Sequence, residues 1–299
     1  MDRQHHNFVS PIIVLGMHRS GTSLISGILD TLGIFMGKHI GRHHEADFFV
    51  KINTWLYKQA GADWDAPNPF QTLLKHNDLR KQLILYLQFL LNSFLTSYYL
   101  GLARYVTCRN MFHMNCRWGW KDPANCHTLP IWLKIFPDAK IIYIKRHGID
   151  VASSLKTRGE QYFMKNEIRF EKSALFRWYL VWRQHFTLQS RVRAFSDSVV
   201  CRDLNKGIRL WDNYNNAVLA VIGDFPEKNL LSLKYEDLLC NPVRYIEKLK
   251  LFCGSDIPTA SIQKIASTVD QSKAYAYKKD QELIAIAEEN REILSHHQY

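Results

Sequence analysis

The chain carries an anion-binding type of loop near its start, Arg19 to Ser23. An apolar run from Ile12 predicts a strand before it, and apolar residues at helical spacing after Ser23 predict a helix. A tight loop between a strand and a helix directs several backbone N–H groups and the positive end of the helix dipole toward one point. The sequence therefore predicts a phosphate site in which Arg19 supplies a cation.

This loop differs from the usual nucleoside triphosphate motif at one position. Gly16 and Gly21 have the spacing of the Walker A loop, but Thr22-Ser23 stands where Lys-Ser/Thr is expected. The missing lysine is the side chain that reaches the β- and γ-phosphates. The loop is therefore predicted to bind a 5′-phosphate group without a triphosphate tail.

A second basic position follows the apolar run Lys140 to Ile144, which predicts a buried strand. A P-loop NTPase has a strand-end aspartate that holds Mg²⁺, whereas this run ends in Lys145-Arg146. Ser154 lies two helical turns beyond Arg146, and an arginine with a hydroxyl can bind a phosphate. A ligand with two separate phosphates and no magnesium fits both loops.

Together these motifs resemble the sulfotransferases that use 3′-phosphoadenosine-5′-phosphosulfate (PAPS). In that family a basic residue precedes Ser-Gly-Thr-Thr/Ser, as in Arg19 to Ser23, and an arginine precedes a serine by eight positions, as in Arg146 and Ser154. Lys121-Asp122-Pro123 resembles the Lys-Asp-Pro turn of the branch with tyrosylprotein and many bacterial sulfotransferases. Further similar stretches extend the resemblance from about Ile12 to Leu239. They are Phe136 to Lys140 and Tyr235 to Leu238.

The resemblance implies PAPS as sulfuryl donor, 3′,5′-ADP as product, in-line displacement and no metal. Arg19 and the loop N–H groups would stabilise charge on the bridging oxygen, and Lys121 would stabilise the leaving group. The positions expected to bind the nucleotide are Arg19, Ser20, Gly21, Thr22, Ser23, Arg146 and Ser154. His147 to Asp150 departs from the more frequent Asp-Pro-Arg-Asp of the family. In the family a late basic loop closes the 3′-phosphate site. The candidates for its basic residues in this chain are Lys273, Lys278 and Lys279.

Glu45 is the predicted general base, because it follows the first helix by one loop, as an acidic residue does in the resembling branch. His43 and His44 are alternatives, since imidazole titrates near neutrality without help. A purely structural role for Glu45, as a charged cap on a helix predicted over Asp47 to Ala60, is the third interpretation.

Strands that alternate with helices predict a three-layer, P-loop-like α/β fold with a central, mainly parallel sheet and helical additions. We expect one domain over residues 1–299, with a helical extension over about 258–299. A long, largely buried helix is expected to run on through Leu83 to Leu100, and a substrate-facing loop from Lys156 to Lys172. In such folds ligands bind beyond the carboxyl ends of the strands.

Composition narrows the class of protein. Of the 299 residues 46% are hydrophobic and 22% charged, which excludes a disordered chain, and the net charge of +11 favours anionic partners. The six cysteines have neither a CxxC pair nor zinc spacing, so we expect reduced thiols in a cytoplasmic protein. Polar residues interrupt Leu83 to Leu100, so no membrane span is expected.

Three other functions remain open on the sequence. A nucleotide kinase or other P-loop phosphotransferase would need magnesium and ATP turnover, and a non-catalytic nucleotide- or glycan-binding protein would bind 3′,5′-ADP without transfer. Nucleic-acid binding is disfavoured, because charge is its single argument. The acceptor is expected to be a small molecule, a glycan or a lipid, and the positive charge favours a polar or acidic one such as a carbohydrate.

Overall fold

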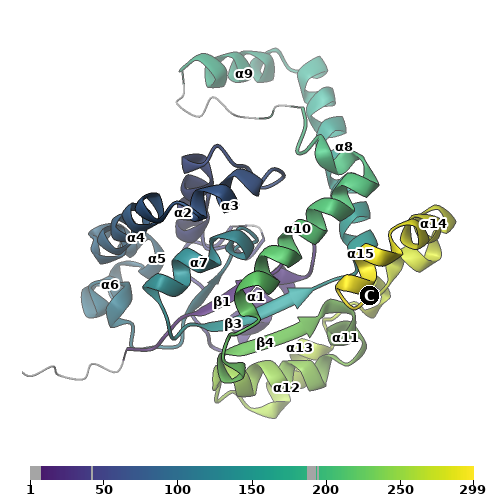
Figure 1. The fold of residues 1–299 in the computed structure, drawn as a ribbon. Coiled ribbons are helices and arrows are strands. Elements are labelled where there is room, and N and C mark those ends of the chain that lie inside the picture. Colours follow the sequence, from purple (N-terminus) through teal and green to yellow (C-terminus); the bar gives the residue numbers. More distant parts are fainter. Residues whose placement is uncertain (1–7, 42, 187–192, 194) are drawn as a thin grey trace, which may run out of the picture. The chain divides into compact units, whose positions relative to one another are not determined.

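The computed structural model describes residues 8–41, 43–186, 193 and 195–299. The chain divides into two compact units, of which the first comprises Met1–His147 with Asn213–Ala276 and the second Gly148–Asp212 with Tyr277–Tyr299. Figure 1 shows the elements of both units. The expected single domain over 1–299, with its extension over about 258–299, stays a prediction.

A parallel sheet with the strand order β2-β1-β3-β4 forms the centre of the first unit. Its strands are β1 (Ile12–Leu15), β2 (Gly119–Lys121), β3 (Lys140–Lys145) and β4 (Leu230–Lys234). Since the strands are parallel, their carboxyl ends meet at one edge, and three of them end in a lysine: Lys121, Lys145 and Lys234. The predicted α/β class with a parallel sheet is confirmed.

Helices and 3₁₀ turns connect these strands. Those that lie wholly within the first unit are α1 (Thr22–Thr31), α2 (Asp47–Gln59), α3 (Asn68–Leu74), α4 (Asn77–Asn92), η1 (Phe94–Thr96), α5 (Ser97–Leu100), α6 (Leu102–Cys108), η2 (Met111–His113), α7 (Asn125–Ile135), η4 (Glu227–Asn229), α11 (Tyr235–Cys240), α12 (Pro242–Cys253), α13 (Thr259–Ala266) and η5 (Gln271–Lys273). The second unit contains α8 (Gly148–Lys172), α9 (Ala174–Phe186), η3 (Val200–Arg202), α14 (Gln281–Glu289) and α15 (Arg291–His296). Two elements cross the boundary, α10 (Leu204–Ile222) and η6 (Ala276–Lys279).

Strands β1, β2 and β3 are almost wholly buried, and since successive side chains point to opposite sides, both faces of the sheet are covered there. Ile12 and Val14 pack in an apolar core with residues of α1, α12 and α13. On the opposite face, Phe49 of α2 stacks on Trp120 of β2 with 3.9 Å between ring centroids. Figure 1 draws α12 and α13 on one side of the strands and α2 and α7 on the other. The three-layer prediction is confirmed for this unit.

Two local predictions are wrong. The expected long helix ends at Asn92, where the extended backbone of Ser93 starts η1, and α5 follows. It is also less buried than expected, since Phe89 and Phe94 are 75% and 68% exposed. Lys156 to Lys172 is no loop but part of α8.

The six cysteines are free thiols, as predicted, and four of them are buried: Cys108, Cys126, Cys201 and Cys253. The cytoplasmic location inferred from them stays a prediction. Within the described residues, no single helix has the length and apolar composition to cross a membrane. One bent pair, α4 with the segment Phe94–Leu100, meets that criterion at an angle of 68°.

Candidate functional site

The loop between β1 and α1 has the backbone conformation of a tight anion-binding turn. Arg19 and Gly21 have φ values of 69° and 95°, in the left-handed region, which is uncommon for a residue with a side chain such as Arg19. A Cβ atom at Gly21 would lie 2.2 Å from the ring of Tyr235, so only glycine fits there. The Ser20 hydroxyl donates to the carbonyl oxygen of Met17 (2.6 Å) and fixes the turn. The first N–H groups of α1 are thereby presented at its amino end.

Two hydroxyl groups of α1 hold the segment that carries the predicted base. The Ser23 and Ser26 hydroxyls donate to the main-chain carbonyls of His43 and His44, each at 2.9 Å. The Gly41 N–H donates to the carbonyl oxygen of Glu45 (2.8 Å) and closes the turn. Both histidine side chains are exposed. The loop is therefore positioned by main-chain atoms and not by imidazole groups.

Glu45 and Lys121 form an ion pair beside the first loop. Lys121 Nζ donates to Glu45 Oε1 at 2.8 Å and lies 3.5 Å from the hydroxyl of Ser23. The Lys121 side chain is 1% exposed and that of Glu45 is 22% exposed. Burial lowers the pKa of Lys121, and the carboxylate of Glu45 opposes this effect. Three residues predicted from separate stretches of sequence thus meet at one point.

Asp122, next to Lys121, is buried in a turn before α7. Its carboxyl oxygens accept hydrogen bonds from Asn53 Nδ2 and from the Ala124 N–H, each at 2.9 Å. Burial raises the pKa of Asp122 to about 7, and the negative charge of Glu45 adds to the rise. Asp122 does not cap α7, whose N-cap residue is Ala124; its bond to the Ala124 N–H holds the turn just before that helix.

A buried amide network beneath these residues was not predicted. Asn53 Oδ1 accepts from Thr128 Oγ1 (3.0 Å) and from Trp132 Nε1 (2.9 Å), and Asn53 Nδ2 also donates to Asn125 Oδ1 (2.9 Å). Asn125 Nδ2 in turn donates to the Val14 carbonyl of β1 (3.2 Å). The network ties α2, α7 and β1 together below the carboxyl edge of the sheet. A lone asparagine on the apolar face of the predicted Asp47 helix was its one sequence signal.

Arg146 connects the second predicted loop to the first. Its Nη1 donates to the Arg19 carbonyl (3.2 Å) and its Nη2 to the Lys273 carbonyl (3.3 Å). The guanidinium group lies 5.0 Å from the centroid of the Tyr235 ring, the ring that also packs on Gly21. Arg146, Arg19 and the candidate Lys273 are therefore brought together.

The remaining nucleotide-binding candidates belong to the second unit. Ser154 is half-buried on α8, and Lys278 and Lys279 are at the end of η6. Because these three residues lie in the other unit, their expected role at the 3′-phosphate stays a prediction.

Glu236 fixes the start of the loop after β3. Its Oε1 accepts the N–H of His147 at 2.8 Å, and Glu236 is 1% exposed. This contact anchors the loop that follows Arg146. The segment that begins at His147, which departs from the family motif, is thus held by its backbone N–H.

His18, inside the first loop, was missed by sequence reasoning. Its ring packs edge-on against Trp64 at 4.9 Å and against Tyr214 at 6.2 Å between centroids. The Tyr214 hydroxyl donates to the Trp64 carbonyl (2.7 Å). The segment around Trp64 is thereby held beside the phosphate loop. Among the residues that the structure describes, no group of three or more His, Cys, Asp or Glu side chains is arranged to hold a metal.

Comparison with known proteins gives a family. The model described as "Sulfotransferase family" matches residues 11–200, which is more than half of the chain. No curated protein matches the sequence significantly.

Similar solved structures include three sulfotransferases. The sulfotransferase domain from the curacin biosynthetic pathway is 15% identical, with 94% of this chain and 96% of that chain covered and a TM-score of 0.46. The domain from the Synechococcus PCC 7002 olefin synthase is 14% identical, with 96% of each chain covered and a TM-score of 0.47. Mouse sulfotransferase SULT7A1, complexed with PAP, is 16% identical, with 90% of this chain and 67% of that chain covered and a TM-score of 0.41. These scores lie below 0.5, so the assignment rests on the family match.

Proposed function

The chain belongs to the sulfotransferase family, and we propose that it transfers a sulfuryl group from PAPS to a hydroxyl or amine of its acceptor, a small molecule, glycan or lipid. The contact among Glu45, Lys121 and Ser23 carries this proposal, because it unites a base, a cation and a hydroxyl beside an anion-binding loop. Sulfuryl transfer is an in-line displacement that needs a proton acceptor, alignment of the reactants and stabilisation of the leaving oxygen.

The first loop suits the 5′ end of the donor. Its N–H groups and the positive end of α1 would bind the phosphate oxygens, while Arg19, which is exposed, would reach the sulfuryl group. Gly21 leaves room for the close approach of the backbone, and Ser20 holds the turn from inside through its bond to Met17. Thr22 and Ser23 begin the helix that presents these groups.

Glu45 and Lys121 would act as a coupled pair. The ammonium group of Lys121 pairs with the carboxylate of Glu45 and orients it, and this carboxylate would take the proton of the acceptor hydroxyl. Once Glu45 is protonated, the pairing weakens and Lys121 can stabilise negative charge on the oxygen that leaves. The acceptor oxygen forms a bond to sulfur as the bond between sulfur and the bridging oxygen breaks, and 3′,5′-ADP carries the charge away.

Arg146 would bind the 3′-phosphate, together with Ser154 and with the late segment around Lys273. Its contacts with the Arg19 and Lys273 carbonyls support this role, since they hold the guanidinium next to the first loop. The residues proposed for the donor are all cations, hydroxyls or amides, which suits an anionic nucleotide without a divalent ion.

A thermal-shift screen tests this proposal on the whole chain. We expect 3′,5′-ADP to raise the melting temperature more than AMP, ADP or ATP does, in the presence of a chelator. Radiolabelled PAPS offered with sugars, phenols, amines and lipids should then label one acceptor class. A larger shift with ATP and magnesium would instead support the phosphotransferase interpretation, and strong 3′,5′-ADP binding without transfer would support a non-catalytic protein.

A further inference from the structure

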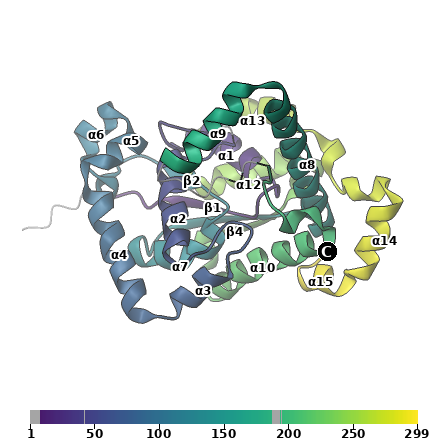
Figure 2. The same cartoon turned by 90° about the horizontal axis from the view of Figure 1, so that it is seen from above.

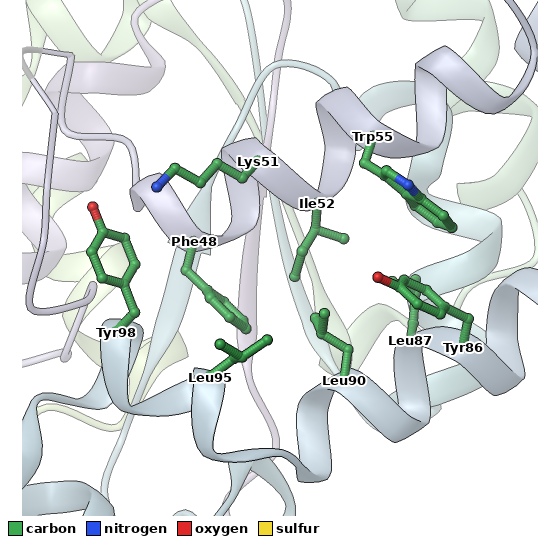
Figure 3. Close-up of a pocket in the computed structure, with 9 residues that line it drawn as sticks. All are labelled: Phe48, Lys51, Ile52, Trp55, Tyr86, Leu87, Leu90, Leu95 and Tyr98. Carbon is green, nitrogen blue, oxygen red and sulfur yellow. The ribbon is translucent and has the colours of Figure 1, made fainter. Parts of the chain in front are cut away.

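An apolar groove lies between α2 and α4 of the first unit (Figure 3). Its volume is about 410 Å³, within the range of small-molecule sites. The two helices lie side by side in Figures 1 and 2. Apolar and aromatic side chains from both helices line it, and they include Phe48, Ile52, Trp55, Leu87 and Leu90. One end is closed by Trp55, whose ring stacks on Tyr86 at 4.5 Å between centroids.

The opposite end of the groove is cationic. Figure 3 shows Lys51 and Tyr98 together at that end, away from Trp55. The ammonium nitrogen of Lys51 lies 4.5 Å from the centroid of the Tyr98 ring, and the ring of His39 stacks on the same tyrosine at 4.5 Å. A ligand that fills the apolar part therefore meets positive charge where the groove ends.

A second cavity of about 710 Å³ adjoins the groove and shares Leu95 and Tyr98 with it. Its lining combines apolar and aromatic side chains with three residues that carry basic groups: Lys38, His39 and Arg104. Of the described residues that line either cavity, none is acidic. The combined surface is thus mainly apolar, and its basic groups lie toward the second cavity.

We propose that the two adjoining cavities form a binding site for an amphiphile with one hydrocarbon chain and an anionic head. The chain lies in the groove between α2 and α4, and the head lies against Lys51, Lys38 and Arg104. Charge complementarity selects this occupant, because a second copy of the chain would bring like charges together and a neutral apolar ligand would leave the basic cavity unused. The proposal does not depend on the activity proposed above.

Fatty acids of increasing length test the groove. Octanoate, decanoate, dodecanoate and myristate are titrated into the whole protein below their micelle concentrations, with calorimetry and tryptophan fluorescence as readouts. Affinity should rise by about fourfold per added methylene until the groove is filled. Tetradecanol should bind more weakly than myristate, by about tenfold, because it lacks the charge that the basic cavity recognises. Absent or length-independent binding would overturn the proposal.

Matched variants separate the two parts of the site. Leu90→Trp fills the groove and should abolish binding of both myristate and tetradecanol, whereas Leu85→Trp, at an exposed position of α4 that does not line it, should leave binding unchanged. Arg104→Gln should weaken the binding of myristate about tenfold and leave the binding of tetradecanol unchanged. Lys81→Gln is its control. Equal loss in a variant and its control would contradict the assignment. So would sedimentation that shows self-association, disrupted by Leu90→Trp, in place of amphiphile binding.

Discussion

The ammonium nitrogen of Lys121 and Oε1 of Glu45 are 2.8 Å apart, but the two partners experience different environments. Lys121 is 1% exposed, whereas Glu45 keeps 22% of its side-chain surface in contact with solvent. The buried partner therefore depends on the exposed one for the stability of its charge, and the reverse dependence is weaker.

This asymmetry predicts unequal effects on stability. Glu45→Gln leaves a buried ammonium without its counter-ion and should lower the free energy of unfolding by roughly 1–3 kcal/mol. Lys121→Met keeps the volume of the buried side chain and should cost less, since no buried charge remains. Urea denaturation at neutral pH measures both. If Lys121→Met lowered the free energy of unfolding more than Glu45→Gln did, Lys121 would stabilise the fold by contacts other than the ion pair.

The general base is identified by a set of three substitutions. Glu45→Gln should lower kcat by about 10²–10⁴-fold while the affinity for 3′,5′-ADP changes little, because proton removal and nucleotide binding use different groups. His43→Gln and His44→Gln are matched controls, since their main-chain carbonyls keep the bonds to Ser23 and Ser26. Near-normal turnover of Glu45→Gln together with loss in either histidine variant would transfer the role to imidazole.

Asp122 should make stability depend on pH. Its pKa in the folded protein, about 7, lies above the ordinary value of 3.8, so the folded state binds this proton more tightly than the unfolded state does. Stability from this group is therefore present below about pH 4 and is lost as the pH rises to about 7, by roughly 1–4 kcal/mol in total.

The measurement compares Asp122→Asn with the native chain by urea denaturation at several pH values. The variant should gain stability relative to the native protein as the pH rises through this window. Asp138→Asn, at an exposed position, controls for the loss of one carboxylate charge. A pH-independent difference for Asp122→Asn would mean that the carboxyl group titrates normally.

Gly21 is predicted to tolerate no side chain. Gly21→Ala would combine an unfavourable φ of 95° with a Cβ atom 2.2 Å from Tyr235, and should cost about 1–3 kcal/mol and weaken 3′,5′-ADP binding. Gly61→Ala is the control, because Gly61 also has a positive φ, 67°, but has no atom within 4 Å of the added Cβ. Thermal melting and nucleotide titration of both variants separate the steric effect from backbone strain. Equal effects would exclude the contact with Tyr235 as the cause.

Arg146 should distinguish between two nucleotides. Arg146→Ala should weaken the binding of 3′,5′-ADP by at least about tenfold and leave the binding of 5′-AMP nearly unchanged. Only 3′,5′-ADP carries the 3′-phosphate that a guanidinium would bind. Arg117→Ala removes the same charge from a residue just before β2, at the opposite edge of the sheet, and serves as the control. Equal weakening of both nucleotides by Arg146→Ala would contradict a role at the 3′-phosphate.

Local sequence sufficed for the strands and the phosphate loop. The β-branched run at Ile12 favours an extended strand, and the glycines at 16 and 21 permit the positive φ values that the loop adopts. Helical periodicity did not identify the helix over 156–172, because a period of 3.6 residues is visible only where one face of a helix is apolar and buried. Residues on several sides of that stretch of α8 are exposed, among them Tyr162, Met164 and Ile168.

No glycine or proline marks the end of α4 in the sequence. Ser93 ends the helix in an extended conformation, and its hydroxyl accepts the N–H of Leu95, a capping contact that serine favours. The contact between Glu45 and Lys121 joins residues 76 positions apart, so local pattern could suggest each residue but not the pair. The Asn53 network likewise depends on three elements packed together.

The run of lysines at the carboxyl edge of the sheet has an energetic consequence. In β3 and β4 the register sets Lys145 opposite Lys234, and burial together with this neighbour lowers the pKa of Lys145. Folding thus brings two like charges together on neighbouring strands at the carboxyl edge of the sheet. Diffusing polyanions are drawn toward such an edge from a distance, so their encounter rates should fall steeply with ionic strength, and occupancy by any phosphate ester should relieve the repulsion.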